Sequence, residues 1–156
     1  MSAVLLEQAL WAAIAATAFA VLFNVPRRAL PACALVAAVA FFARGAFLAV
    51  HPSSLELATL LAAMLAGMLA MAAGKLLRAP AVIFAVPAVV PFVPGALALR
   101  ATREAIALVS EPAAHLRRDT LDALALHDLQ ILLFVGAMAG GVAVPSLLFR
   151  HRRPLT

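Results

Sequence analysis

The sequence predicts an all-α integral membrane protein with about five transmembrane helices. Of its 156 residues, 66% are hydrophobic and only 12% are charged, which is too apolar for one soluble domain of this size. The apolar residues form runs long enough to cross a bilayer, and basic residues lie at the ends of those runs. We therefore expect residues 1–156 to form a single multi-pass transmembrane domain.

Five apolar segments are long enough to be spans. A helix rises about 1.5 Å per residue, so about 20 residues cross the hydrocarbon core. The predicted spans cover about residues 5–23, 29–50, 55–73, 79–99 and 123–149. Because no Lys or Arg precedes the first segment, we expect it to remain a spanning helix and not to act as a cleaved signal peptide.

The connection over residues 100–122 is the one extended polar segment of the chain. Its first part, 100–109, is predicted to be an interfacial helix before the last span, with Arg103 and Glu104 toward water. Basic residues favour an N-terminus outside and a C-terminus inside, because seven of them then lie inside and five outside. The inner ones are Arg27, Arg28, Lys75, Arg78, Arg150, Arg152 and Arg153.

The fourth span, residues 79–99, is predicted to be broken by prolines. It contains Pro87, Pro91, Pro94 and Gly95, and each interior proline removes a helix hydrogen bond. Non-helical backbone is tolerated at membrane depth only where protein or a water-filled cavity satisfies the freed carbonyl groups. Transporters place broken helices of this kind at their substrate sites. A plain kink or segment end is the alternative. We therefore include Pro91, Pro94 and Gly95 among the candidate substrate-binding or pathway residues.

Arg44 is the strongest single candidate for a substrate-binding or pathway residue. It lies about six residues before the end of its apolar run, where a charge costs at least about 2.5 kcal/mol on insertion scales. In one interpretation the guanidinium simply reaches the lipid headgroups. In the other it faces a polar cavity, pairs with a carboxylate and binds an anionic or zwitterionic ligand.

Two further pairs of residues are candidates. His127 and Asp128 lie early in the last span and could relay protons or bind a cation, although Asp128 could simply favour the positive end of the helix dipole. Asn24 and Pro26 are expected to cap and terminate the first span, and a role in the substrate pathway stays open for both.

Small residues four apart predict helix-packing surfaces in two spans. The third span contains Ala63 and Gly67, and the last contains Gly136 and Gly140. This spacing lets a neighbouring backbone approach closely. It suits a transporter, and it equally suits an accessory subunit that only stabilises or localises a larger membrane partner.

The sequence lacks the motifs of enzymes and of nucleic-acid-binding proteins. It contains no HExxH, no CxxC, no Gly-rich phosphate loop and no nucleophile elbow. Its basic residues lie at the ends of apolar segments and form no solvated basic face. We therefore expect no catalytic activity, no cofactor, no metal and no nucleic-acid partner.

Several segments together resemble one known family. They are "FNVPRRAL" (23–30), "FFARGAFL" (41–48), "SLELATLLAAMLAG" (54–67), "PAVIFAVPAVVPFVPG" (80–95) and "VGAMAGGVAVP" (135–145), which precedes a basic tail. The chain resembles the small, YjjB-like subunit of the threonine/serine exporter (ThrE) family over nearly its whole length. The "PFVPG" of the fourth span, together with the Asn-Val-Pro turn, is the most specific element.

The resemblance implies a five-helix subunit of a bacterial inner-membrane exporter that works with a larger, YjjP-like subunit. It implies efflux of small hydrophilic solutes, threonine and serine or a dicarboxylate such as succinate, driven by the proton-motive force. The family pattern carries over to Asn24, Pro26, Arg28, Arg44, Pro91, Pro94 and Gly95. His127 departs from it, because a relative has asparagine there. Besides an exporter subunit and an accessory subunit, a third possible function is a small channel, which would conduct its solute without a proton gradient.

Overall fold

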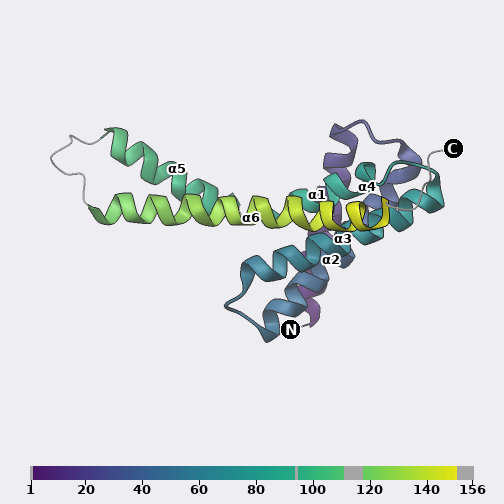
Figure 1. Ribbon diagram of the computed structural model, residues 1–156, viewed down its shortest axis with the longest axis horizontal. Helices are drawn as coiled ribbons and strands as arrows, with labels where there is room; N and C mark the ends of the chain where they lie inside the picture. The colour runs from purple at the N-terminus through teal and green to yellow at the C-terminus, as the bar shows by residue number, and fades with distance from the viewer. Residues whose placement is uncertain (1, 94, 111–117, 151–156) are drawn as a thin grey trace. The chain divides into compact units, whose positions relative to one another are not determined.

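The computed structural model of the chain describes residues 2–93, 95–110 and 118–150. Within these ranges the chain forms six α-helices and two short 3-10 helices and contains no strand (Figure 1). In order they are α1 (Ser2–Leu22), η1 (Arg27–Ala29), α2 (Leu30–Val50), α3 (Leu55–Leu77), α4 (Val82–Val89), η2 (Val90–Phe92), α5 (Gly95–Ser110) and α6 (Arg118–Arg150). The predicted all-α fold is confirmed.

Among the described residues, four helical segments are long and apolar enough to cross a membrane. They are Ala3–Leu22, Arg27–Val50, Leu55–Leu77 and Leu124–Pro145. A shorter apolar helix, Val82–Phe92, lies where the fourth span was expected. The count of five spans therefore stays a prediction.

The segment expected as one span over 79–99 is divided differently in the structure. Its helical part ends at Phe92, and Gly95 begins the separate helix α5. Val93 precedes a proline, and a residue in that position is disfavoured in helical conformation. Pro87 lies inside α4, which continues past it. Residues 95–99 thus belong to the helix that was expected to start only at residue 100.

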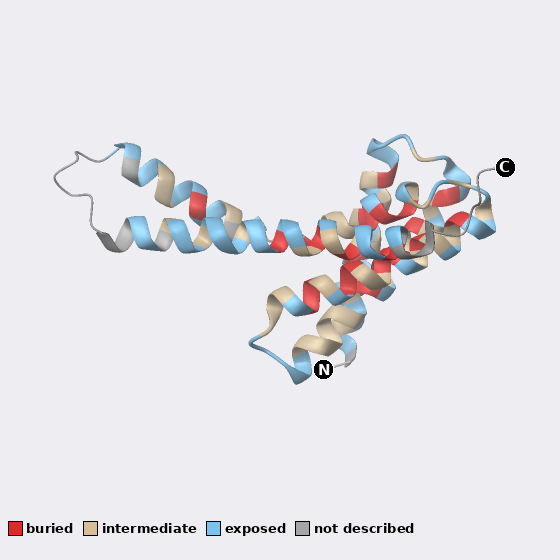
Figure 2. Cartoon of the chain, in the orientation of Figure 1, coloured by how far each residue is buried: buried red, intermediate tan, exposed pale blue. Residues whose placement is uncertain are grey.

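The described residues fall into two compact units, 2–92 with 137–150, and the described part of 93–136. In the first unit α2 packs against α1, α3 and α4. Buried residues gather where these helices meet (Figure 2), and alanines make up most of them. We call one set the alanine seam: Ala9, Ala12, Ala16 and Ala20 of α1, Ala37 and Ala40 of α2, and Ala58, Ala62, Ala63, Ala66 and Ala70 of α3.

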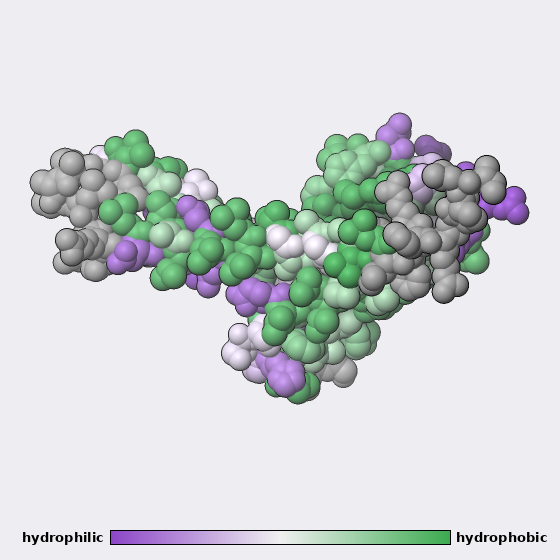
Figure 3. Space-filling view, in the orientation of Figure 1, coloured by the Kyte–Doolittle hydropathy of each residue, from purple (hydrophilic) through white to green (hydrophobic). Residues whose placement is uncertain are grey.

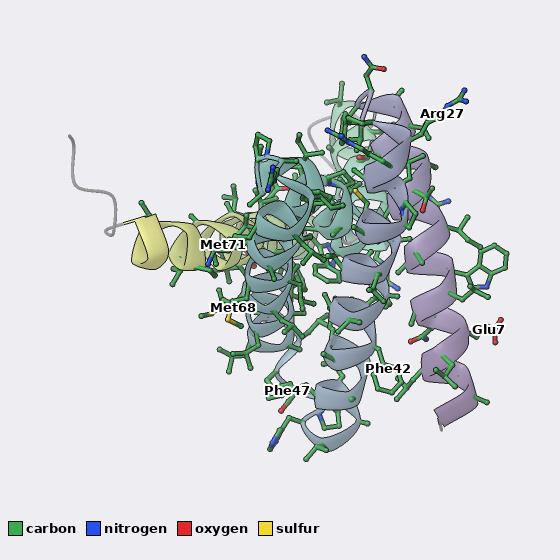
Figure 4. All side chains as sticks on the ribbon, turned by 90° about the vertical axis from the view of Figure 1, so that its right-hand side faces the viewer. Glu7, Arg27, Phe42, Phe47, Met68 and Met71 are labelled. Carbon is green, nitrogen blue, oxygen red and sulfur yellow. The ribbon has the colours of Figure 1, made fainter. Side chains whose placement is uncertain are left out.

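The alanine seam follows from the environment that the composition implies. Lipid tails are as apolar as leucine, so helices in a bilayer associate by close backbone packing and not by the burial of large apolar side chains. Many large apolar residues accordingly remain exposed, and hydrophobic residues cover much of the surface seen in Figure 3. Glu7 on α1 and Arg27 at the α1–α2 connection are exposed and point outward (Figure 4).

Helix α3 contacts the C-terminal part of α6 through glycines. A Cβ on Gly67 would lie 3.3 Å from the Cα of Val142 and 3.3 Å from the ring of Pro145. A Cβ on Gly141 would lie 2.5 Å from the Cβ of Ala63, a distance that real side chains do not tolerate. The two backbones therefore approach as closely as glycine permits.

Two helices end on residues in the left-handed conformation. Asn24 has φ 57°, and the amide of Val25 donates to the carbonyl of Ala20 at 2.9 Å, which satisfies a free carbonyl at the end of α1. Asparagine is the residue that most readily replaces glycine in this role. Arg78, with φ 51°, ends α3 in the same way.

Candidate functional site

Arg44 borders a pocket in the first unit. The pocket has a volume of about 540 Å³ and is lined by residues of α1, α2 and η2. We call it the Arg44 pocket, and its lining residues are Gln8, Trp11, Ala12, Ala15, Phe41, Arg44, Gly45, Leu48 and Pro91. Gly45 lets α1 come close at this point, because a Cβ there would lie 2.6 Å from the Cδ2 of Leu5. Two sequence candidates, Arg44 and Pro91, thus share one pocket.

Neutral groups hold the guanidinium of Arg44. Its Nε donates a hydrogen bond of 3.0 Å to the hydroxyl oxygen of Thr59 on α3. Its Cζ lies 5.6 Å from the ring centroid of Phe41 and 5.7 Å from that of Phe92, within the range of cation–π attraction. The two rings also contact each other, with centroids 5.6 Å apart. Arg44 is therefore held from α2, α3 and η2.

The Arg44 pocket carries a positive charge and no compensating negative one. Arg44 is the only charged residue among those that line the pocket. Within the described part of the chain, no carboxylate lies within ion-pair distance of it, so the partner expected from the sequence is not found there. A half-buried guanidinium in an apolar helix bundle can attract an anionic group, because attraction between charges is stronger where water is excluded.

The remaining proline and turn candidates lie elsewhere or outside the described residues. Pro94 lies outside them. Gly95 begins α5 in the second unit, and a Cβ there would have no other atom within 4 Å. Asn24 and Pro26 are exposed at the α1–α2 connection and do not line the Arg44 pocket. Their roles in a substrate pathway stay predictions.

His127 contacts Glu104, and not its sequence neighbour Asp128. In the second unit the Nδ1 of His127 on α6 lies 2.8 Å from the Oε2 of Glu104 on α5. Both side chains are largely shielded, with 22% and 25% exposed, whereas Asp128 is exposed. Glu104 was expected to face water, because the sequence does not show that α6 packs beside α5. Arg103 is exposed, as expected.

The predicted packing glycines differ in their surroundings. Gly67 is buried against α6, while a Cβ on Gly136 or Gly140 would meet no atom within 4 Å. The glycine that contacts α3 most closely is Gly141, which the four-residue spacing did not single out. A packing role for Gly136 and Gly140 against another chain stays a prediction.

Sequence reasoning missed Thr59, Gln8 and Trp11 at the Arg44 pocket. Thr59 is fully buried. A single hydroxyl within the apolar run of residues 55–73 was the available signal, since polar groups inside membrane helices seek partners. Gln8 and Trp11 lie on the early turns of α1, where polar and amphipathic side chains are common and give no signal of their own.

The fold and the Arg44 pocket define a helical, multi-pass membrane protein with a cationic site in its helix bundle. The chain belongs to the threonine/serine exporter family. A family model described as "Threonine/Serine exporter, ThrE" matches residues 8–148, which include the whole Arg44 pocket. No solved structure matched the chain. Membership places the protein among membrane transporters, and the resemblance drawn from the sequence is confirmed.

Proposed function

We propose that this chain is the small membrane subunit of a two-component exporter of carboxylate-bearing solutes, either threonine and serine or a dicarboxylate such as succinate. The observation that supports this most directly is the guanidinium of Arg44, which borders a pocket and has only neutral partners among the described residues. Each proposed solute carries a carboxylate, the group that arginine binds with two parallel hydrogen bonds.

The proposed partner is a larger, YjjP-like subunit in the bacterial inner membrane. The described residues line the Arg44 pocket from α1, α2 and η2, and the partner would supply the opposing half of an alternating-access pathway. The α1–α2 connection carries Arg27 and Arg28, and the end of α3 carries Lys75 and Arg78. Residues of these two regions pack in one core cluster, so both lie at the same end of the bundle. This supports a cytoplasmic location for that end and an external N-terminus.

Efflux from proteoliposomes tests the proposal. Vesicles loaded with labelled serine, threonine or succinate would contain this chain alone, the larger subunit alone, or both. We expect efflux of one solute only when both are present and a proton gradient is imposed. Equal efflux from the larger subunit alone would make this chain an accessory subunit. Efflux that continues without a proton gradient would indicate a channel.

We further propose that Glu104 and His127 form the proton-carrying pair of the exporter. Histidine is the side chain that most readily changes charge near neutral pH, and the 2.8 Å contact allows a proton to pass between imidazole and carboxylate. The Glu104–His127 pair takes the place of the pair that the sequence suggested, His127 and Asp128. Among the described side chains, the imidazole of His127 contacts Glu104 and not Asp128.

Glu104→Gln is expected to uncouple transport from the proton gradient. Its amide keeps the size of the side chain but does not accept a proton, so proton-driven net efflux should fall about tenfold or more while solute exchange continues. Both rates are measured in the same proteoliposomes. Asp128→Asn separates the two hypotheses, since normal driven efflux in this variant supports the Glu104–His127 pair. Loss in Asp128→Asn with normal efflux in Glu104→Gln would contradict it.

A further inference from the structure

Thr59 is the one polar residue in the buried core of the described chain, with 0% of its surface exposed. Its hydroxyl donates to the carbonyl oxygen of Leu55 at 2.8 Å, and its oxygen accepts from the Nε of Arg44 at 3.0 Å. A hydroxyl has a single hydrogen. Because Leu55 takes that hydrogen, the oxygen of Thr59 faces Arg44 only as an acceptor.

The hydrogen bond from Thr59 to the carbonyl of Leu55 does not by itself explain why a threonine occupies this buried position. Thr17 on α1 and Thr102 on α5 make the same bond, each at 2.8 Å to the carbonyl four residues earlier. Such a bond satisfies the hydroxyl of any threonine in a helix. Of these three threonines, only Thr59 has an arginine on its oxygen.

The contact to Thr59 restricts how Arg44 can bind an anion. A guanidinium offers a carboxylate two paired modes, one through Nε and a terminal nitrogen and one through both terminal nitrogens. Thr59 occupies Nε, and the rings of Phe41 and Phe92 lie beside the group at 5.6 and 5.7 Å. The mode that remains uses both terminal nitrogens.

We propose that Thr59 is a positioning residue for the transported solute. By accepting the Nε hydrogen of Arg44 it orients the guanidinium so that the two terminal nitrogens bind the solute carboxylate end-on. This inference rests on the proposed function, because it assigns the carboxylate to the Arg44 pocket. It adds a residue on α3, outside the pocket lining, whose effect on the solute is exerted through Arg44.

Transport kinetics of Thr59→Val and Thr59→Ser test the positioning role. Valine has the size of threonine without its acceptor, whereas serine keeps the hydroxyl. In proteoliposomes with both subunits, Thr59→Val should raise the half-saturating concentration of serine or threonine about tenfold, as expected for a lost hydrogen bond to a charged group, with a nearly unchanged maximal rate. Thr59→Ser should restore the wild-type value. Thr17→Val is the matched control and should leave it unchanged.

A second measurement needs no solute. In full-length protein labelled with ¹⁵N-arginine, the Nε–H signal of Arg44 is assigned by its loss in Arg44→Lys. Hydrogen exchange of this signal should be slow in wild type, Thr59→Ser and Thr17→Val, and about tenfold faster in Thr59→Val, because the acceptor is gone.

The two measurements separate failure of this inference from failure of the proposed function. Unchanged Nε–H exchange in Thr59→Val overturns the positioning role whatever the transport result. Faster exchange with an unchanged half-saturating concentration also overturns it, since the orientation of Arg44 would then not matter to the solute. If the wild-type pair transports none of the three solutes while the exchange pattern is as expected, the proposed function fails and the Arg44–Thr59 bond stands.

Discussion

Arg44→Gln is expected to weaken solute binding to the Arg44 pocket strongly. Glutamine removes the one positive charge of the pocket lining and the paired donors that fit a carboxylate. The loss of charged hydrogen bonds of this kind is about 3 kcal/mol, so affinity should fall on the order of 100-fold. Arg44→Lys should retain part of the affinity, because it keeps the charge and loses only the planar fork.

The chain contains its own probe for this measurement. Trp11 is its single tryptophan, there is no tyrosine, and Trp11 lines the Arg44 pocket. Titration of the purified protein with serine, threonine or succinate should therefore change Trp11 fluorescence. Arg27→Gln, an exposed arginine outside the pocket, is the control. If Arg44→Gln in correctly inserted protein binds and exports as well as wild type, the assigned role is wrong.

Gly141→Ala is expected to be the most destabilising small substitution in the contact between α3 and α6. The added Cβ would lie 2.5 Å from the Cβ of Ala63, 2.9 Å from the carbonyl oxygen of Leu60 and 3.0 Å from the amide of Met64. Two of these atoms are backbone, so a rotamer change does not relieve the contact. Overpacking of this kind costs about 1–3 kcal/mol, which thermal unfolding in detergent would show as a lower Tm.

Gly140→Ala is a matched control from the same helix. A Cβ on Gly140 meets no atom within 4 Å, and alanine favours a helix by up to about 1 kcal/mol over glycine. This variant should be neutral or slightly stabilising in the isolated chain. Ala63→Gly should partly rescue Gly141→Ala, because it removes the shortest contact. Equal destabilisation by Gly140→Ala and Gly141→Ala would contradict the packing described here.

The sequence predicted the first three helices well, because local signals mark their ends. Asn24 adopts a conformation that few other residues tolerate, and proline follows two residues later. His51 and the proline after it separate α2 from α3. Hydropathy and helix-breaking residues are both local signals in the sequence, so these helix boundaries could be predicted without any knowledge of packing.

The features that depend on contacts between helices could not be predicted from the sequence. Residues 93–99 continue an apolar run, so hydropathy joined them to the segment before, whereas the helix changes at Val93. Glu104 looks like a water-facing residue of an amphipathic helix, and its contact with His127 arises from a second helix. Arg44 was identified by its depth, but its acceptor Thr59 is 15 residues away and carries no charge that would have marked it.

The alanine seam has a consequence for motion. An alanine methyl group has no rotamers, so helices that meet along alanines can shift past one another without any side chain changing conformation. Sliding of packed helices is one of the ways in which proteins alternate between two states. Among the described residues of this unit, the largest fully buried side chains are Phe84 of α4 and Phe92 of η2. We therefore expect the smoothest sliding between α1 and α2, whereas the hydrogen bond from Arg44 to Thr59 ties α2 to α3, and the buried rings of Phe84 and Phe92 oppose sliding of α4 and η2.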